Sequence, residues 1–383
     1  MKRLLILSVR AGAGHTRAAE ALEEAARSRW PGAHVAHVDI LDFTGGFYRE
    51  GYVRSYLEMV NRAPELWGYL YRASDRGKRP GFQARVVRLF DRLEFARFRR
   101  FVREFRPDSV LSTHFLAAQV FAPYRRRGRD RFPLGLVVTD FDVHAFWVQP
   151  TADRFFVATG ELAARLAEQG IPAANVAVTG IPVRAAFSRR RSRARERARL
   201  GIPNDRPVVL VMSGGAAVGS LAETASRVLA RGHVQVLAVA GRNEKAHKAL
   251  QAVRVPRSSA LRAFGLVEDM ASLMAAADLF VGKSGGSTTA ECLAMGLPMI
   301  VCDPIPGQEE RNCDFLLEAG AGVKAYGPAS LFYKLDALLS DRVRLQRMKR
   351  AALRVARPNA ADEILGSLAA PKRVDGRQPA VDN

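Results

Sequence analysis

The stretch from Ser284 to Asn312, SGGSTTAECLAMGLPMIVCDPIPGQEERN, contains the side chains best suited to bind a charged ligand. Gly285 and Gly286 let the backbone approach a ligand closely, and we expect a helix to start near Ser287. Free N–H groups at a helix start attract phosphate, and the hydroxyls of Ser287 and Thr288 are further donors. The stretch therefore predicts a phosphate site at the start of a helix.

Glu291 has two interpretations. The run Thr288-Thr289-Ala290-Glu291 matches a capping box, in which the carboxylate only closes the helix start. A carboxylate beside a phosphate site can instead accept hydrogen bonds from both ribose hydroxyls, as the acidic residue of dinucleotide-binding folds does. The sequence leaves both interpretations open.

A polar cluster, Gln308, Glu309 and Asn312, follows the next apolar run. Adjacent amide and carboxylate side chains suit the vicinal hydroxyls of a sugar. Together with a phosphate site and a candidate ribose ligand, this cluster predicts a site for a nucleotide sugar.

The elements that must position these residues alternate between strands and helices, which predicts an α/β fold with parallel sheets covered on both faces. Each half opens with an apolar strand, a glycine-bearing loop and a helix, LLILSVRAGAGHTRAAEAL and VVLVMSGGAAVGSLAETA. The expected strands are Arg3–Val9, Val35–Asp39, Asp108–Ser112, Leu134–Val138, Arg154–Val157, Pro207–Met212, Val234–Ala240, Leu261–Leu266, Asp278–Val281 and Pro298–Cys302.

Two such openings predict two Rossmann-like domains that face each other across a cleft. The expected boundaries are an N-terminal domain at 1–180, a linker at 181–205, a C-terminal domain at 206–345, a C-terminal helix at 346–370 that packs back on the first domain, and a disordered tail at 371–383.

The amino-acid composition limits the kinds of binding partner that the protein can have. The 383 residues carry a formal net charge of +21, with arginines clustered at Arg97–Arg106, Arg125–Arg131 and Arg189–Arg199. These clusters suit an anionic membrane surface, or they are solvated faces of a chain rich in arginine. Nucleic acid is the weaker partner, because no zinc-finger or aromatic–basic pattern accompanies the charge. No apolar run reaches the roughly 18 residues of a membrane span, and the three cysteines lack metal-ligand spacing.

The segment Phe43–Gly81 mixes aromatic residues with arginine. Such a mixture suits a membrane interface, where rings sit at headgroup depth and arginines meet phosphates. The alternative is an aromatic core between helices. The residues assigned to acceptor or membrane contact here are Tyr52, Tyr56, Trp67 and Tyr71.

The segment GKSGGSTTAECLAMGLPMIVCDPIPGQEERN resembles the donor site of glycosyltransferase family 28. The similarity extends over most of the chain and includes GAGH, PELWGYLYRASD, VVTDFDVHAFWV, GIPV, MSGGAAVGS and AGRNEK. The branch it is most similar to contains the monogalactosyldiacylglycerol synthases and the processive diacylglycerol glucosyltransferases. The GlcNAc transferase of peptidoglycan lipid intermediates is a more distant relative.

The resemblance implies a GT-B fold, with a UDP-sugar in the C-terminal domain and a lipid acceptor in the N-terminal domain. It implies that Ser287 and Thr288 meet the diphosphate, Glu291 the ribose, and Gln308 and Glu309 the hexose. The remaining residues it assigns are Gly214, Gly215, Gly241, Arg242, Asn243 and Asn312 on the donor side, and Gly12, Gly14 and Trp147 on the acceptor side.

Inverting transfer needs a base for the acceptor hydroxyl, and His15 at the end of the first glycine loop is the candidate. Its alternative is a capping or packing role, and Asp140 and His144 are the second candidates, as base or as orienter of His15. Asp140 and Asp142 have the spacing with which other glycosyltransferases hold a divalent metal, but they lie in the acceptor half. We therefore predict no catalytic metal and no cofactor.

These residues predict a UDP-hexose transferase that acts on diacylglycerol, peripherally bound at the cytoplasmic face of the membrane. The alternatives are a GlcNAc transferase acting on a polyprenyl-diphosphate precursor, an epimerase of the same fold, and a non-catalytic basic lipid-binding protein with a vestigial sugar-nucleotide fold. The sequence leaves open glucose or galactose, and whether one sugar or several are added.

Overall fold

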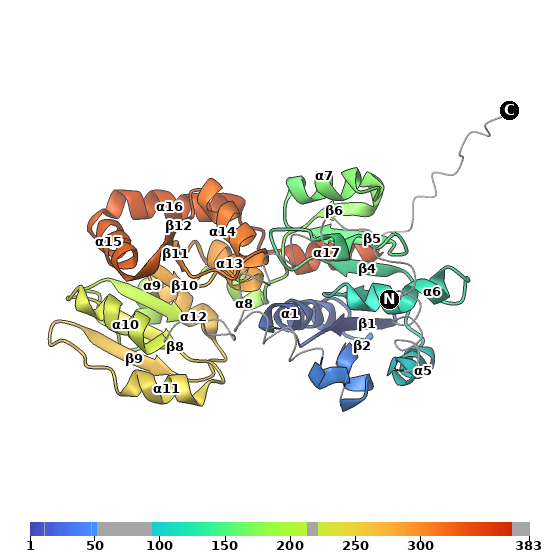
Figure 1. Ribbon diagram of the computed structural model, residues 1–383, viewed down its shortest axis with the longest axis horizontal. Coiled ribbons are helices and arrows are strands. Elements are labelled where there is room, and N and C mark those ends of the chain that lie inside the picture. Colours follow the sequence, from blue (N-terminus) through green and yellow to red (C-terminus); the bar gives the residue numbers. More distant parts are fainter. Residues whose placement is uncertain (11, 47, 52–93, 213–220, 370–383) are drawn as a thin grey trace.

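The computed structural model describes residues 1–10, 12–46, 48–51, 94–212 and 221–369. Two parallel six-stranded sheets lie side by side, each with helices packed on it (Figure 1). The predicted α/β class with one sheet in each half is therefore confirmed.

The N-terminal sheet has the strand order β2-β1-β3-β4-β5-β6. Its inner strands β1, β3, β4 and β5 are largely buried because helices cover both faces; Leu4 of β1 is paired with Val35 of β2 and Ser109 of β3. The strands are β1 Arg3–Ser8, β2 His34–Asp39, β3 Ser109–Ser112, β4 Leu134–Val137, β5 Arg154–Val157 and β6 Val176–Val178. The helices are α1 Ala13–Arg29, η1 Ile40–Phe43, α5 Ala96–Phe105, α6 Leu116–Arg125, η2 Ala145–Trp147, α7 Gly160–Glu168 and η3 Ala173–Asn175.

The C-terminal sheet has the order β12-β11-β10-β7-β8-β9. Its strands are β7 Val208–Met212, β8 Gln235–Val239, β9 Ala260–Phe264, β10 Leu279–Gly282, β11 Met299–Cys302 and β12 Gly322–Ala325. The helices after the N-terminal domain are α8 Ala185–Ser188, α9 Arg193–Arg199, α10 Leu221–Ala230, α11 Glu244–Gln251, α12 Met270–Ala276, α13 Gly286–Met295, α14 Gln308–Glu318, α15 Gly327–Ser340, α16 Arg342–Val355 and α17 Ala360–Ala369.

All ten predicted strands are present, with bounds that differ by at most two residues. The sequence analysis missed β6 and β12, each of which is one of the two edge strands of its sheet. Both are short, and β12 (GVKA) contains a glycine and a lysine, so neither has the continuous apolar run that marks a buried strand.

Two connections join the domains, and they cross at Gly180. This residue has φ of +93°, and a Cβ there would lie 2.5 Å from Cβ of Arg357, on the returning connection. Beyond that crossing, α17 packs against α1, with Ile364 and Leu365 in the same core as Leu22. The alanine-rich inner face of α1 permits this close approach of two helices.

The arginine-rich residues expected as a linker pack on the C-terminal domain. Val183, Phe187 and Ile202 belong to its core, and α9 lies against α12. Four arginines of this stretch are paired with acidic side chains of the same domain: Arg191 and Arg199 with Glu196 and Asp269, and Arg193 and Arg197 with Asp278. Arg184 is instead paired with Glu24 of the N-terminal domain.

Candidate active site

The candidate site lies where the two domains meet, which we call the junction. In each sheet the strand order reverses beside the first strand, between β1 and β3 and between β7 and β10. Open α/β sheets bind ligands outside the carboxyl ends of the strands at such points. Helix α1 follows β1, helix α13 follows β10, and the two helices are in contact (Figure 1).

His15 lies in the first turn of α1, as predicted. Its Nδ1 is 2.6 Å from the carbonyl oxygen of Thr113 and 2.9 Å from the hydroxyl of Thr139. A carbonyl oxygen only accepts, so Nδ1 carries the proton and donates. In the neutral ring this leaves the Nε2 lone pair free to accept a proton, which is the tautomer a general base requires.

Desolvation of the His15 ring lowers its pKa, although the nearby Asp140 carboxylate and the Thr113 carbonyl act in the opposite direction. Desolvation also raises the pKa of Asp140. Loss of water therefore favours the neutral form of both groups, and a neutral imidazole is the form that can take a proton.

His114 is the ring in contact with His15, and the sequence analysis did not single it out. The two rings meet edge to face with centroids 4.7 Å apart. The Nδ1 of His114 accepts from the Leu116 amide, and burial holds its pKa well below the usual range. The signal available in the sequence was its position directly after a buried strand.

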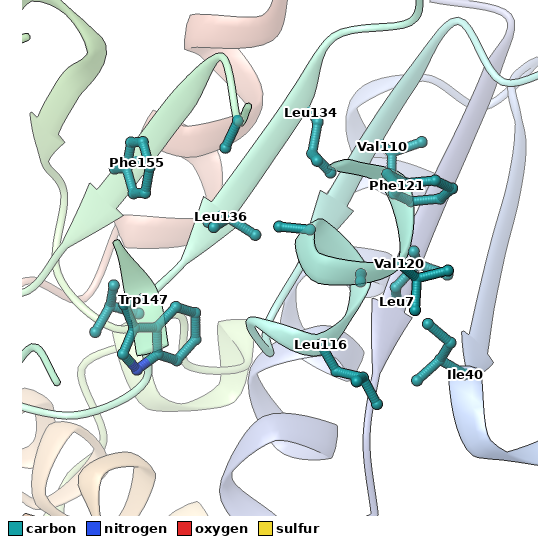
Figure 2. Packing of buried hydrophobic residues seen from close by; sticks show 14 of the residues in the cluster. Leu7, Ile40, Val110, Leu116, Val120, Phe121, Leu134, Leu136, Trp147 and Phe155 are labelled. Carbon is teal, nitrogen blue, oxygen red and sulfur yellow. The ribbon is translucent and has the colours of Figure 1, made fainter. Parts of the chain in front are cut away.

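Trp147 is buried beside these rings. Its indole centroid lies 6.5 Å from that of His15 and 6.5 Å from that of His114. The indole belongs to the N-terminal core together with Leu116 and Leu136 (Figure 2). Trp147 therefore lines the His15 site on the side of the domain core. It is buried, so it does not form part of an exposed membrane-facing surface.

Asp140 contacts the opposite domain. Its carboxylate accepts from Nδ2 of Asn312 at 3.0 Å, and Oδ1 of Asn312 accepts from the Phe141 amide at 2.7 Å. Phe141 also stacks on Phe315, with centroids 4.3 Å apart. The oxygen and the nitrogen of the Asn312 amide thus both bind the N-terminal domain in this structure. The resemblance had instead implied that Asn312 binds the donor.

Of the residues in TDFDVH, Thr139 is hydrogen-bonded to His15, whereas Asp142 and His144 have partners within their own segment or on α7. Asp142 is paired with Arg165, and Nδ1 of His144 accepts from the Phe146 amide. The two carboxylates of the Asp-x-Asp spacing therefore have different partners, Asn312 for one and Arg165 for the other. Within the described ranges, no group of three or more His, Cys, Asp or Glu side chains could hold a metal ion.

The start of α13 faces α1 across the junction. The helix begins at Gly286, close to the expected Ser287. A Cβ on Gly286 would lie 2.0 Å from the Thr139 carbonyl oxygen, so only glycine permits this approach of the domains. The hydroxyl of Ser287 donates to the Gly14 carbonyl at 3.0 Å, and Thr288 follows in the same turn, less deeply buried.

Glu291 does not form a capping box. The residue before α13 is Gly285, no side chain caps the helix, and Glu291 lies in its second turn. The capping interpretation is wrong because the helix begins two residues before Thr288. Instead, the buried carboxylate of Glu291 accepts from Nη1 of Arg17 at 3.3 and 3.4 Å. Burial raises its pKa to about 7, while the charge and hydrogen bond of Arg17 lower it.

Gln308 and Glu309 begin α14, at the carboxyl end of β11. One oxygen of Glu309 accepts from the Ile305 amide at 2.8 Å, and a Cβ on Gly285 would lie 3.8 Å from the other. Burial raises the pKa of Glu309. Lys283, which the sequence analysis did not select, is buried three residues before α13; burial lowers its pKa, and the charge of Glu309 acts in the opposite direction.

The remaining donor residues are only partly described. Gly241, with φ of +61°, turns the chain after β8, Arg242 is exposed, and Asn243 caps α11 by accepting from the Ala246 amide at 3.0 Å. Gly214 and Gly215 lie outside the described residues. Gly12 immediately precedes α1.

The aromatic segment is described only at its beginning. Phe43 packs against Phe98 and Phe101 of α5, with centroids 5.6 and 4.9 Å apart, and Tyr48 packs against Phe95. The side chains of Phe43 and Tyr48 are both partly buried and pack against the core of the N-terminal domain. The segment's predicted acceptor or membrane residues Tyr52, Tyr56, Trp67 and Tyr71 lie outside the described residues.

Comparisons with known proteins match each half of the chain to a family of glycosyltransferases. The profile of the monogalactosyldiacylglycerol (MGDG) synthase family matches residues 15–183, and that of the glycosyltransferase family 28 C-terminal domain matches residues 208–364. A processive diacylglycerol beta-glucosyltransferase of Bacillus cereus (strain AH187) is 27% identical over 97% of this chain and 95% of its own length. That of Bacillus mycoides (strain KBAB4) is 28% identical over 96% and 93%.

Solved structures share the fold. MurG of Acinetobacter baumannii superposes with a TM-score of 0.60 at 16% identity, covering 96% of this chain and 99% of that one. The S. aureus MnaA–UDP co-structure gives 0.59 at 14% identity, covering 95% of each chain. The predicted GT-B fold is confirmed.

Proposed function

Because the chain belongs to glycosyltransferase family 28, in the branch of the MGDG synthases and processive diacylglycerol glucosyltransferases, we propose that it transfers a hexose from a UDP-sugar to diacylglycerol. The observation that carries the proposal is the junction itself. It sets a histidine with a free Nε2 lone pair in one domain against a helix start and a buried carboxylate in the other.

In the proposed reaction, Nε2 of His15 takes the proton of the acceptor hydroxyl while that oxygen attacks the anomeric carbon of the donor. The bond from this carbon to the phosphate oxygen breaks with inversion, and its electron pair leaves with UDP. The N–H groups at the start of α13, with the hydroxyls of Ser287 and Thr288, stabilise the negative charge of the departing diphosphate. Ser287 must first release the Gly14 carbonyl.

Carboxylates of the C-terminal domain recognise the sugars. Glu291 accepts from the ribose hydroxyls, and Gln308 with Glu309 binds hexose hydroxyls. Supporting this division, Glu291 is buried in the second turn of the helix whose start binds the diphosphate, and Glu309 lies beside Gly285. The absence of a catalytic metal stays a prediction.

Product analysis tests the proposal most simply. The protein is incubated with diacylglycerol vesicles and either UDP-glucose or UDP-galactose, and the lipids are analysed by mass spectrometry. We expect a hexosyl-diacylglycerol from at least one donor, and none from the His15→Ala variant. A protein that binds UDP yet makes no glycolipid from either hexose would contradict the assigned acceptor, and transfer from UDP-GlcNAc to a polyprenyl diphosphate is then the next assay.

Membrane association belongs to the same proposal. No helix within the described parts of the chain is long and apolar enough to span a bilayer. Eight arginines of the two N-terminal clusters are exposed, where they can meet anionic headgroups at the cytoplasmic face, whereas Arg193 and Arg197 of α9 are paired with Asp278. The exposed members are Arg97, Arg100, Arg103, Arg106, Arg126, Arg127, Arg129 and Arg131.

Vesicle co-sedimentation tests this surface against an internal control. Replacing Arg97, Arg100 and Arg103 of α5 with Gln should weaken binding to anionic vesicles at moderate salt, because each lost charge near the surface removes about 1 kcal/mol. Replacing the exposed Arg344, Arg347 and Arg350 of α16 removes the same charge from the other domain and should change binding little. Equal losses in both triple variants would mean that the net charge, and not this surface, directs binding.

A further inference from the structure

The pair formed by Arg17 and Glu291 links the two domains at the donor site. Arg17 follows His15 by two residues on α1, so the helix that carries the candidate base also carries this guanidinium. Glu291 is 4% exposed and lies on α13. The residue proposed to bind the ribose therefore has its counter-ion in the opposite domain.

The geometry of the pair leaves the carboxylate able to bind a ligand. A single nitrogen of Arg17 contacts both oxygens of Glu291, at 3.3 and 3.4 Å, and both contacts are longer than a usual charged hydrogen bond. An ionised carboxylate offers about four acceptor sites. Arg17 can thus stay in place while ribose hydroxyls donate to the remaining lone pairs.

A buried carboxylate needs such a counter-ion to serve as an acceptor. Removing Glu291 from water favours its protonated form, which has an O–H donor and fewer acceptor sites. The charges that oppose this are Arg17 and, with a smaller effect, Arg184, which precedes α8 and is itself paired with Glu24 of α1.

Among the described residues, the other elements packed on α13 bring no further counter-charge to Glu291. Helix α12 (MASLMAA) has no titratable side chain. From α14, Glu309 lies beside Gly285 before the start of α13, and from α16, Lys349 lines the same pocket as Met295 at its end. Cys292 is the titratable neighbour on α13 itself, and burial raises the pKa of its thiol well above the usual range.

We propose that Arg17 is a positioning residue for the donor: it holds Glu291 as the ionised carboxylate that receives the ribose, so that donor binding in one domain depends on a side chain of the other. This inference rests on the proposed function, because it takes the ribose as the ligand of Glu291. It gives α1 two roles, a base for the acceptor at His15 and support for the donor at Arg17.

Calorimetric titration with UDP between pH 6.5 and pH 9 tests the inference. Near pH 6.5, Arg17→Ala should weaken UDP binding by about tenfold, the effect of a one-unit rise in the pKa of Glu291. At pH 9 the loss should fall below about twofold, because the carboxylate then ionises without help. The titration of UDP itself is common to all variants and cancels in the ratio.

Three further variants control the experiment. Arg17→Lys should keep most of the affinity at pH 6.5, because a cation remains. Arg27→Ala removes the same charge from the exposed end of α1, where Arg27 pairs with Glu23, and should leave UDP affinity unchanged. Glu291→Gln should bind UDP weakly, with a ratio to wild type that grows as the pH rises.

The outcomes separate the inference from the proposed function. Tighter UDP binding by Arg17→Ala would show that Arg17 competes with the ribose, and a loss that is the same at every pH would show that Arg17 contacts UDP directly. An unchanged UDP affinity of Arg17→Ala would show that the Arg17–Glu291 pair has only a structural role. Each of these overturns the inference alone, provided that wild type binds UDP and Glu291→Ala does not. If wild type fails to bind UDP, the proposed function itself fails.

Discussion

The two sides of the junction are built from the same topology but prepared for different chemistry. On the N-terminal side, the groups beside the reversal of strand order are two desolvated histidines and the hydroxyls of Thr113 and Thr139. On the C-terminal side they are a helix start and the buried carboxylates Glu291 and Glu309. Desolvation alone lowers the pKa of the imidazoles and raises that of the carboxylates.

This difference shows how one fold supplies two functions. A neutral imidazole can take a proton from a lipid hydroxyl, whereas a carboxylate can receive the hydroxyls of a sugar. Among the side chains that cross the junction, Arg17 and Asn312 connect the polar groups of one domain to those of the other. Removing a group from one side of the junction should therefore change the chemistry of that side and leave that of the other side in place.

The largest effect is expected from His15. His15→Ala should lower turnover by about 100-fold or more, because it removes the general base. His144→Ala, which removes the buried histidine whose Nδ1 accepts from the Phe146 amide, should retain turnover within about tenfold. Steady-state rates at saturating donor provide the measurement. Turnover within a few fold of wild type in His15→Ala would transfer the role to Asp140 or His144.

The next largest effect concerns stability and its dependence on pH. Folding raises the pKa of Glu291 from its usual 4.5 to about 7, so the folded protein loses stability as pH rises through this window. Above the window the ionised carboxylate costs about 3 kcal/mol. Glu291→Gln should therefore unfold at a higher denaturant concentration than wild type at pH 8.5, and the difference should fall below about 1 kcal/mol at pH 5.

This result would show that the chain keeps a buried charge for binding at a cost in stability. An equal stability difference between Glu291→Gln and wild type at both pH values would mean that folding does not shift the pKa of Glu291. The contrast between the two sides of the junction would then depend on the histidines and Glu309. His15 should contribute the opposite pH dependence. Because burial lowers its pKa, it makes the folded protein more stable as pH rises, and His15→Ala should lose this dependence in acid unfolding.

A smaller effect is expected from Asn312. Asn312→Ala leaves the Phe141 amide and the Asp140 carboxylate without their partner, which costs about 1–3 kcal/mol. Small-angle scattering should show a larger radius of gyration, since this contact joins the domains. Asn243→Ala removes only the cap of α11 and should cost about 1 kcal/mol without a change in radius. An unchanged radius for both variants would mean that Arg17 and Ser287 suffice to hold the junction.

Sequence reasoning reached the fold because continuous apolar strands and glycine loops are local signals. It also singled out His15 and Glu291, which the structure places in the first turn of α1 and the second turn of α13, and their predicted roles stay predictions. It missed Arg17 and the interdomain role of Asn312, because their partners are 274 and 172 residues away along the chain and only domain packing brings them together. The capping-box alternative at Thr288 failed for a related reason: the close approach of Gly286 to Thr139 sets where α13 begins.

The division of labour across the junction is tested most directly by calorimetric titration of UDP into wild type, His15→Ala and Glu291→Ala. We expect His15→Ala to bind UDP within about twofold of wild type, because the base acts on the acceptor. Glu291→Ala should lose about 1.5–3 kcal/mol of binding free energy with the ribose contact. Normal UDP binding by Glu291→Ala, or a comparable loss in His15→Ala, would contradict the account.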